Sequence, residues 1–323
     1  MSKLTKIEGL ISSADVIFTD ETCRTIDEDA CREVWKYLLE CGVSAIVTNE
    51  EPQCLTLKER SRLLEIAVDE VKGRVPVLDY IWSDTTRGAI EQGLNAKEHG
   101  AAAVLSGPPN IMGWDGTATE YLVEHFRKFS KEADIPLILM GGPGLPGNFY
   151  MPPQTFVEVA KQVDNLLGCK FTVADTASFV EPMRALKAVR ESIVCLKAGS
   201  LALADAYLAG GDGSLSGLLA LAKEDVQIFK ACRNGDSKTA KEISAKVLEL
   251  GLAIYGFSYN WPLIYFEYRF KIASWLMGLI PRPYMRRPYL PPPMKEIETI
   301  RDLLIKTGKP VVNEPKQLAI STV

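Results

Sequence analysis

Short apolar runs alternate with longer amphipathic segments along the first two thirds of the chain. The apolar runs are nearly continuous, which is typical of strands buried on both faces, whereas the segments between them repeat apolar positions every three or four residues, as helices do. The expected strands are ADVIFT, VSAIVT, VPVLDYIW, AAAVLSG, IPLILMGG, GCKFTVAD, SIVCLKAG and GDGSLSG.

Each expected strand is followed by an expected helix, which makes eight strand-helix units. Eight units are the number that closes a parallel barrel, so we predict an α/β fold, a (β/α)8 TIM barrel over residues 1–235. The strand signal then stops. Residues 236–308 are expected to form a C-terminal helical extension, and residues 309–323 an irregular tail.

Composition narrows the class of partner. The chain has 323 residues with 37 basic against 41 acidic side chains, a net charge of −4, so no surplus positive field attracts nucleic acid or an anionic membrane. The seven cysteines are an odd number without a CxxC pair, which favours reduced thiols and a cytoplasmic location. We expect no targeting or membrane segment, because the apolar stretch 252–280 is broken by Pro262, Glu267, Arg269 and Lys271.

Lys170 is the most unusual residue of the expected strands, because it interrupts the apolar run LLGCKFTVAD. It could snorkel outward between helices or pair with a buried carboxylate such as Asp175. Alternatively, burial lowers the pKa of the amine, which could then attack a carbonyl carbon to form a Schiff base. Catalytic groups of TIM barrels lie at the carboxyl ends of strands, where Lys170 is expected.

Several segments, in their order, carry a family resemblance: the stretch from TIDEDACREVW to VTNEEPQCLTLKER, then GRVPV, GAAAVLSGPP, EHFRKFSKEADIPLIL, GCKFTVAD, GDGSLSG and RRPYLPP. Over residues 7–308 the chain resembles the dihydrodipicolinate synthase and N-acetylneuraminate lyase family of pyruvate-dependent class I aldolases. The resemblance implies a barrel with C-terminal helices, a homodimer or homotetramer, and Lys170 as the Schiff-base lysine. The chain is identified as a divergent member.

The departures from the family pattern concern proton transfer and carboxylate binding. Met140 stands where the resemblance implies a catalytic tyrosine, and a thioether cannot relay a proton. Asn110 and Ile111 replace an aromatic pair of the same relay, so only Thr48 remains of it. We therefore expect the usual tyrosine relay to be absent.

The family motif Gly-Thr-Thr-Gly-Glu reads Val47-Thr48-Asn49-Glu50-Glu51 here. Asn49 takes the position that holds the 2-keto-acid carboxylate, and Glu50 adds a like charge that could repel it. Leu145 replaces the arginine that receives an acidic second substrate. These changes predict a less acidic, more apolar substrate.

Other groups near the expected mouth could replace the lost hydroxyls. Asp79 ranks next after Lys170, because an acid inside an apolar strand could have a raised pKa. For each of these residues a structural role is the more common one. The remaining candidates are Tyr80, Trp82, Asn110, Tyr150 and Asp175.

Four further residues are expected to be structural. Glu51 should hold its loop or cap the second helix, and Cys169 should face away from Lys170 because side chains alternate along a strand. His99 and His125 are isolated, which makes a metal site improbable on spacing alone. No metal and no cofactor are expected.

We therefore predict a Schiff-base-forming carbon-carbon lyase or aldolase, or a hydratase-aldolase, that acts on a non-standard 2-keto acid or another small carbonyl compound. Lys170, Thr48 and Asp79 are the predicted catalytic residues. The predicted substrate-binding residues are Asn49, Tyr80, Asn110, Met140 and Leu145. The alternative is an inactive family member that binds a small molecule or a protein through the same mouth.

Overall fold

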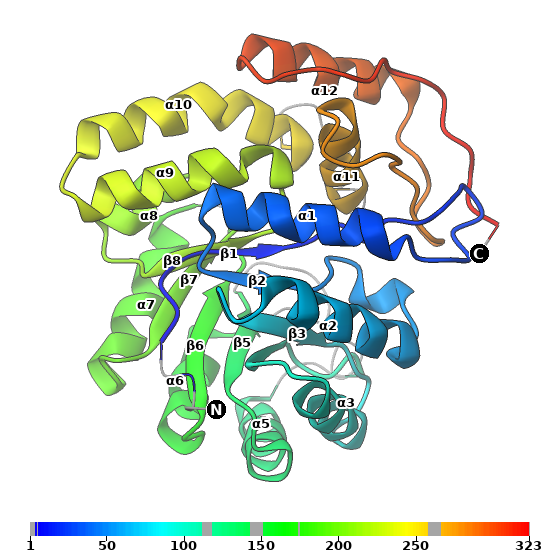
Figure 1. The fold of residues 1–323 in the computed structure, drawn as a ribbon. Helices are drawn as coiled ribbons and strands as arrows, with labels where there is room; N and C mark the ends of the chain where they lie inside the picture. The colour runs from blue at the N-terminus through cyan, green and yellow to red at the C-terminus, as the bar shows by residue number, and fades with distance from the viewer. Residues whose placement is uncertain are drawn as a thin grey trace.

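The computed structural model describes residues 4, 6–111, 118–142, 151–173, 175–257 and 266–322. Its strands pair in parallel and in chain order, and β8 closes on β1, so the predicted (β/α)8 TIM barrel is confirmed (Figure 1). The strands are β1 Gly9–Ser13, β2 Ala45–Val47, β3 Val77–Ile81, β4 Ala103–Ser106, β5 Leu137–Gly141, β6 Leu166–Phe171, β7 Val194–Ala198 and β8 Gly213–Ser216.

Helices surround the barrel on its outside (Figure 1). Side-chain caps fix where several of them begin: the Asp27 carboxylate accepts the Ala30 N–H, and Thr56 and Glu59 form a capping box. The helices of the barrel are α1 Glu28–Cys41, α2 Leu57–Val71, α3 Thr86–Glu98, α5 Thr119–Ala133, α6 Pro153–Gln162, α7 Ala177–Val189, α8 Leu203–Leu208 and α9 Ala222–Arg233, with short 3-10 turns at Pro52–Cys54 and Leu219–Leu221.

One expected strand was wrong. The first strand is GLISS, and the apolar segment ADVIFT follows it instead of forming it. Gly9 and Ile11 pair with β8, and Ile11 also pairs with β2, whereas the Val16 carbonyl accepts a hydrogen bond from Lys271 in the C-terminal region. Both segments are apolar and buried, so hydrophobicity alone could not decide which of them pairs with the neighbouring strands.

Alternate side chains of the strands build two separate apolar layers. One fills the barrel and the other lies between the barrel and its helices. The interior layer is Ile7, Ile11, Ala45, Val47, Leu78, Tyr80, Ala103, Leu105, Ile138, Met140, Leu167, Val194, Leu196 and Leu215. This division decides which side chains of a strand can meet a molecule inside the barrel.

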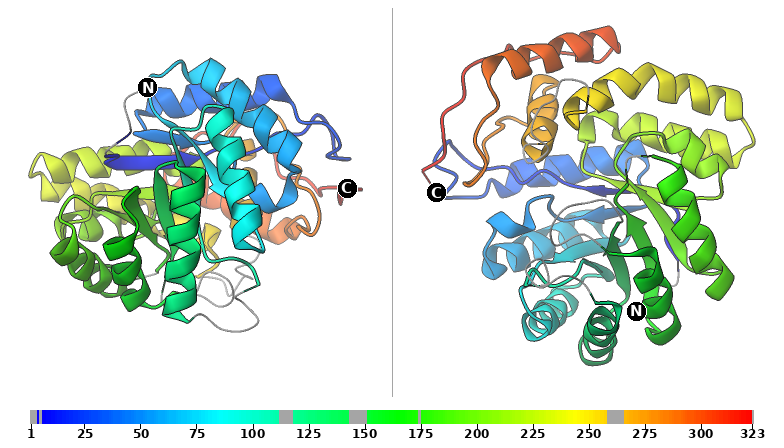
Figure 2. Two further views of the ribbon diagram at one scale, coloured as in Figure 1. Left: turned by 90° about the horizontal axis from the view of Figure 1, so that it is seen from below. Right: turned by 180° about the vertical axis from the view of Figure 1, so that it is seen from behind.

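Three further helices follow the barrel: α10 Ser237–Ile254, α11 Phe266–Leu276 and α12 Met294–Lys306. Figures 1 and 2 show them together on one side of the barrel, beside α9 and α1. The last described residues, 309–322, contain neither helix nor strand and run back beside the N-terminal segment, where the Ser321 hydroxyl donates to the Thr22 carbonyl (3.2 Å).

Within the described ranges, none of the helices combines the length and the apolar character that crossing a membrane requires.

Candidate active site

Lys170 lies on β6 with its side chain directed into the barrel. Its strand neighbours Cys169 and Phe171 belong to the helix-facing apolar layer, so the alternation turns Lys170 inward, and the expected outward position of Cys169 is confirmed. In register, Lys170 pairs with Met140 on β5 and with Leu196 on β7. Both neighbours belong to the interior layer. The Lys170 side chain therefore lies between two apolar side chains.

Burial lowers the pKa of the Lys170 amine, and the carboxylates of Glu50 and Glu267 oppose this shift. Among the described side chains, neither carboxylate forms a direct ion pair with Lys170. A lowered pKa increases the fraction of neutral amine, which is the form that attacks a carbonyl.

Glu50 follows β2 and is the acidic group with the strongest effect on Lys170. Burial raises the pKa of Glu50 to about 7, while Lys170 and a hydrogen bond with the Ser13 hydroxyl act in the opposite direction. Its Oε2 atom is buried without a hydrogen-bond partner. From the sequence, Glu50 was expected only to repel a carboxylate, and its effect on Lys170 was not predicted.

Glu267 belongs to α11 and is the second acid that acts on Lys170. Burial, together with the nearby charge of Glu50, raises the pKa of Glu267 to about 8. Its Oε2 atom is likewise buried without a hydrogen-bond partner. The C-terminal extension thus contributes to the electrostatics of the barrel interior.

Tyr80 is the predicted binding residue that lies in the same interior layer as Met140. Its hydroxyl is 3.0 Å from the Ser13 hydroxyl, and burial raises its pKa well above the ordinary value. Glu50 contributes to that rise, which places the two groups in one electrostatic environment.

Asp79 faces the opposite side of the same strand. It alternates with Leu78 and Tyr80, and its carboxylate lies 2.8 Å from the Arg60 guanidinium of α2. Both side chains are buried; burial raises the pKa of Asp79 and the Arg60 charge opposes the rise. This geometry favours a structural role for Asp79 between the barrel and α2.

Thr48 and Asn49 are buried and belong to the polar cluster around Asp79. The Thr48 hydroxyl is 3.4 Å from the Asp79 carboxylate, and the Asn49 amide donates to Thr48 (3.1 Å) and lies 3.5 Å from Asp79. These contacts separate the predicted site into two groups, one around Lys170 and one around Asp79.

The loop after β4 carries Asn110 and Ile111. The Asn110 amide donates to Asp84 (2.9 Å), so it holds the loop that follows β3, and Ile111 is exposed. Trp82 is partly buried, and its backbone N–H donates to the Gln92 side-chain oxygen (2.9 Å). Leu145 and Tyr150 lie outside the described residues.

Glu51 holds its loop in place, which was one of its two expected roles. Its carboxylate lies 2.6 Å from the Lys271 ammonium of α11, and both side chains are buried. The other expectation, that Glu51 caps the second helix, was wrong, because Thr56 and Glu59 cap α2.

The expected alternative of a pair between Lys170 and Asp175 was also wrong. Asp175 is exposed, and its carboxylate accepts the Ser178 N–H (2.8 Å) at the start of α7. The charge of Asp175 acts instead on Lys197, a second buried lysine whose pKa burial lowers to about 8. The Lys197 ammonium donates to the Val173 carbonyl (2.7 Å), which explains its presence.

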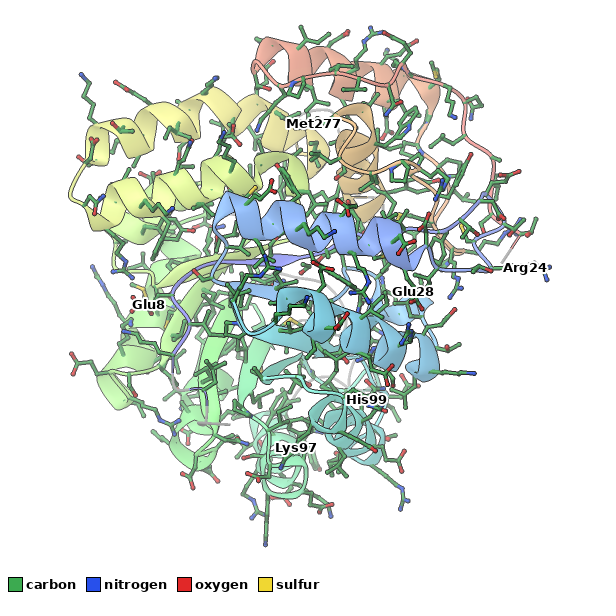
Figure 3. The ribbon with its side chains drawn as sticks, viewed as in Figure 1. Glu8, Arg24, Glu28, Lys97, His99 and Met277 are labelled. Carbon is green, nitrogen blue, oxygen red and sulfur yellow. The ribbon has the colours of Figure 1, made fainter. Side chains whose placement is uncertain are left out.

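The two histidines are separate from this region. Figure 3 shows His99 among the outer helices, where its Nδ1 atom lies 2.8 Å from the Asn95 carbonyl. His125 is buried in α5 beside the Thr86 hydroxyl, and burial lowers its pKa to about 4. Among the described residues, no group of three or more acidic, cysteine or histidine side chains is arranged to hold a metal ion.

Comparison with known proteins identifies the family. The model of the dihydrodipicolinate synthetase family matches residues 6–307. The chain belongs to this family. The 4-hydroxy-tetrahydrodipicolinate synthase of Methanopyrus kandleri is 30% identical to it over 304 residues, which cover 93% of this chain and 94% of that protein.

One further relative agrees with membership of the dihydrodipicolinate synthetase family, and a solved structure shows the same fold. A protein of Escherichia coli K12 named as a probable 2-dehydro-3-deoxy-D-pentonate aldolase, YjhH, is 30% identical over 249 residues, covering 76% of this chain and 81% of that protein. The structure of YagE from Escherichia coli K12, solved in complex with pyruvate, superposes with a TM-score of 0.83 at 22% identity, over 94% of this chain and 99% of that chain.

Members of the dihydrodipicolinate synthetase family are lyases, so the prediction that the chain is an enzyme of the lyase class is confirmed. The resemblance stated from the sequence is confirmed with it, over nearly the same residues.

Proposed function

We propose that this enzyme is a Schiff-base-forming carbon-carbon lyase or aldolase in which Lys170 is the nucleophile. The observation that carries the proposal is the position of Lys170, inside the barrel between Met140 and Leu196. The amine has a lowered pKa, and Lys170 forms no ion pair with another described side chain. A buried ammonium without a direct counterion is costly, whereas a neutral amine there is available for carbonyl addition.

The substrate that fits this surrounding best is an uncharged aldehyde or ketone. Met140 and Leu196 offer apolar contacts, and the ionisable groups that act on Lys170 are the acids Glu50 and Glu267. The Asn49 amide, at the position of the family's carboxylate-binding threonine, is directed toward Thr48 and Asp79. A carboxylate next to the carbonyl would meet like charges, so we place 2-keto acids second.

Family membership favours an enzyme over the alternative of an inactive binder. The missing tyrosine at Met140 supports an altered mechanism, since the lysine is retained beside two acids with raised pKa values.

The experiment is reductive trapping. The protein is incubated with sodium borohydride and, one at a time, pyruvate, acetone, cyclohexanone or benzaldehyde, and its intact mass is measured. We expect an adduct with the uncharged compounds that exceeds the adduct with pyruvate. The Lys170→Met variant, which keeps an apolar chain of similar length, is the matched control and should give no adduct. An equal yield with pyruvate would overturn the substrate class, and an adduct on the control would overturn the nucleophile.

We also propose, from the resemblance, that the enzyme is a homodimer or homotetramer. Size-exclusion chromatography with light scattering should give two or four times the mass of the chain, and the mass of a single chain would contradict the proposal.

A further inference from the structure

We propose that Glu50 is the catalytic acid and base of this enzyme, in place of the tyrosine that Met140 replaces, and that Ser13 and Tyr80 position it. The inference rests on the proposed function of Lys170. It concerns a residue that the family pattern does not use in this way, since Glu50 stands at a glycine of that pattern.

Glu50 occupies a position between β1 and the end of β8. Its carboxyl group is held between Ser13 of β1, which forms a hydrogen bond with it, and Gly217, which follows β8. A Cβ atom at position 217 would lie 2.6 Å from Glu50 Cδ and 2.7 Å from Oε2, so the glycine provides the space that the carboxyl group occupies.

One oxygen atom of the Glu50 carboxyl group lacks a hydrogen-bond partner. Glu50 Oε2 is buried and has no hydrogen-bond partner, although most buried polar atoms in proteins have one. Lys170 acts electrostatically on the same carboxyl group without an ion pair between these two described side chains. Such an oxygen atom can donate a proton to the reacting oxygen, or accept a proton from carbon, in a molecule attached to Lys170.

A chain of hydrogen bonds leads from Tyr80 through Ser13 to Glu50. The Tyr80 and Ser13 hydroxyl oxygens are 3.0 Å apart, and Ser13 bonds to Glu50. If Tyr80 donates to Ser13, the Ser13 hydroxyl donates to Glu50 and leaves the other carboxyl oxygen free. Such a chain fixes the orientation of the carboxyl group.

The proton balance is simple. The Lys170 nitrogen adds to the carbonyl carbon, a proton passes from nitrogen to oxygen, and the product is a carbinolamine. Glu50 as a carboxylic acid then protonates the carbinolamine hydroxyl, water leaves, and an iminium ion and a Glu50 carboxylate remain. The carboxylate removes a proton from the carbon next to the iminium carbon, which gives an enamine and restores the acid.

Ionisable groups from several elements influence the titration of Glu50. Burial raises its pKa to about 7, so both the acid and the carboxylate are populated near neutral pH. The charged or titratable groups coupled to it are Asp15 after β1, Glu51 beside it, Tyr80 on β3, Lys170 on β6, Tyr255 after α10 and Glu267 on α11.

The test is hydrogen exchange at carbon. Acetone or cyclohexanone is incubated with the full-length enzyme in D2O, and loss of the α-proton signal is followed by NMR between pH 5.5 and 8.5. We expect Glu50→Gln, which fills the same space, to slow the exchange about 100-fold or more and to remove the inflection near neutral pH. The Glu65→Gln variant, an exposed change of the same type on α2, should exchange like the parent enzyme.

Two further variants test position. Gly217→Ala keeps the Glu50 carboxyl group but displaces it, and should slow the exchange by up to about 100-fold with little loss of stability, because the displaced group is the end of a flexible side chain. Tyr80→Phe removes the end of the hydrogen-bond chain and should shift the pH inflection.

The outcomes separate the two proposals. An adduct at Lys170 with unchanged exchange and an unchanged pH profile in Glu50→Gln would overturn the role of Glu50 and leave the Schiff base intact. A slow, pH-independent exchange in Glu50→Gln, with the adduct at Lys170 still formed but at a lower rate, supports it. If no carbonyl compound is trapped on the parent enzyme, the role of Glu50 is overturned together with the function on which it rests.

Discussion

Met140 and Lys170 occupy paired positions on β5 and β6, and both side chains face the interior of the barrel. The thioether cannot supply a proton to the amine, and burial is the main cause of the lowered pKa of Lys170.

We therefore predict that Met140→Gln raises the pKa of Lys170. A polar amide at this position solvates the ammonium form, so borohydride trapping should reach half of its maximum at a higher pH than in the parent enzyme. Met140→Leu keeps the apolar volume and should not move this midpoint. Equal midpoints in all three proteins would show that Met140 does not control the amine.

We predict that loss of the buried ion pair between Asp79 and Arg60 lowers the stability of the protein and does not affect the chemistry at Lys170. Asp79→Asn leaves the Arg60 charge uncompensated in the interior and should lower the free energy of unfolding by about 3–5 kcal/mol, measured by urea denaturation. In the folded fraction of this variant, adduct formation at Lys170 should persist. Loss of the adduct in a protein of parental stability would instead make Asp79 a catalytic residue.

The pair of Glu51 and Lys271 joins the loop after β2 to α11, at 2.6 Å between carboxylate and ammonium. Lys271→Met should lower the free energy of unfolding by about 3–5 kcal/mol, because Glu51 then remains buried without its partner. The double variant Glu51→Gln with Lys271→Met should recover part of this loss. Strictly additive losses in a double-mutant cycle would contradict the coupling.

Asp225 predicts a decrease in stability with rising pH. Burial raises its pKa from 3.8 to about 8, and its carboxyl group accepts a hydrogen bond from Ser200 (2.5 Å). Between these two values the folded protein holds a proton that the unfolded chain has released, so the free energy of unfolding falls as the pH rises, by up to about 1.4 kcal/mol per pH unit. Asp225→Asn should remove this contribution between pH 5.5 and 7.5. The same pH dependence in both proteins would contradict the assignment.

Most of the fold could be predicted because most strands are apolar runs that are followed by a helix of clear periodicity. The error at β1 shows the limit of this signal. GLISS and ADVIFT are both apolar, and the choice between them depends on pairing with β8, which is far away in the sequence.

The inward position of Lys170 could be predicted from the alternation with Cys169 and Phe171. The partners of the predicted residues could not, because they come from elements that meet only in the folded chain: Arg60 from α2 beside Asp79, and Glu267 from α11 beside Glu50 and Lys170. A signal for Glu267 was present, since Glu267, Arg269 and Lys271 interrupt an apolar stretch. Charged residues in such a stretch indicate buried partners.

The most direct test of the account is to locate the reductively trapped adduct by peptide mass spectrometry. Among the described lysines, burial lowers the pKa of Lys170 and of Lys197, and of these two only Lys197 donates to a backbone carbonyl in the described contacts. We predict that the added mass lies on the peptide that contains Lys170 and that Lys197→Met retains it. An adduct on Lys197, or none on Lys170 with any of the carbonyl compounds, would contradict Schiff-base chemistry at this lysine.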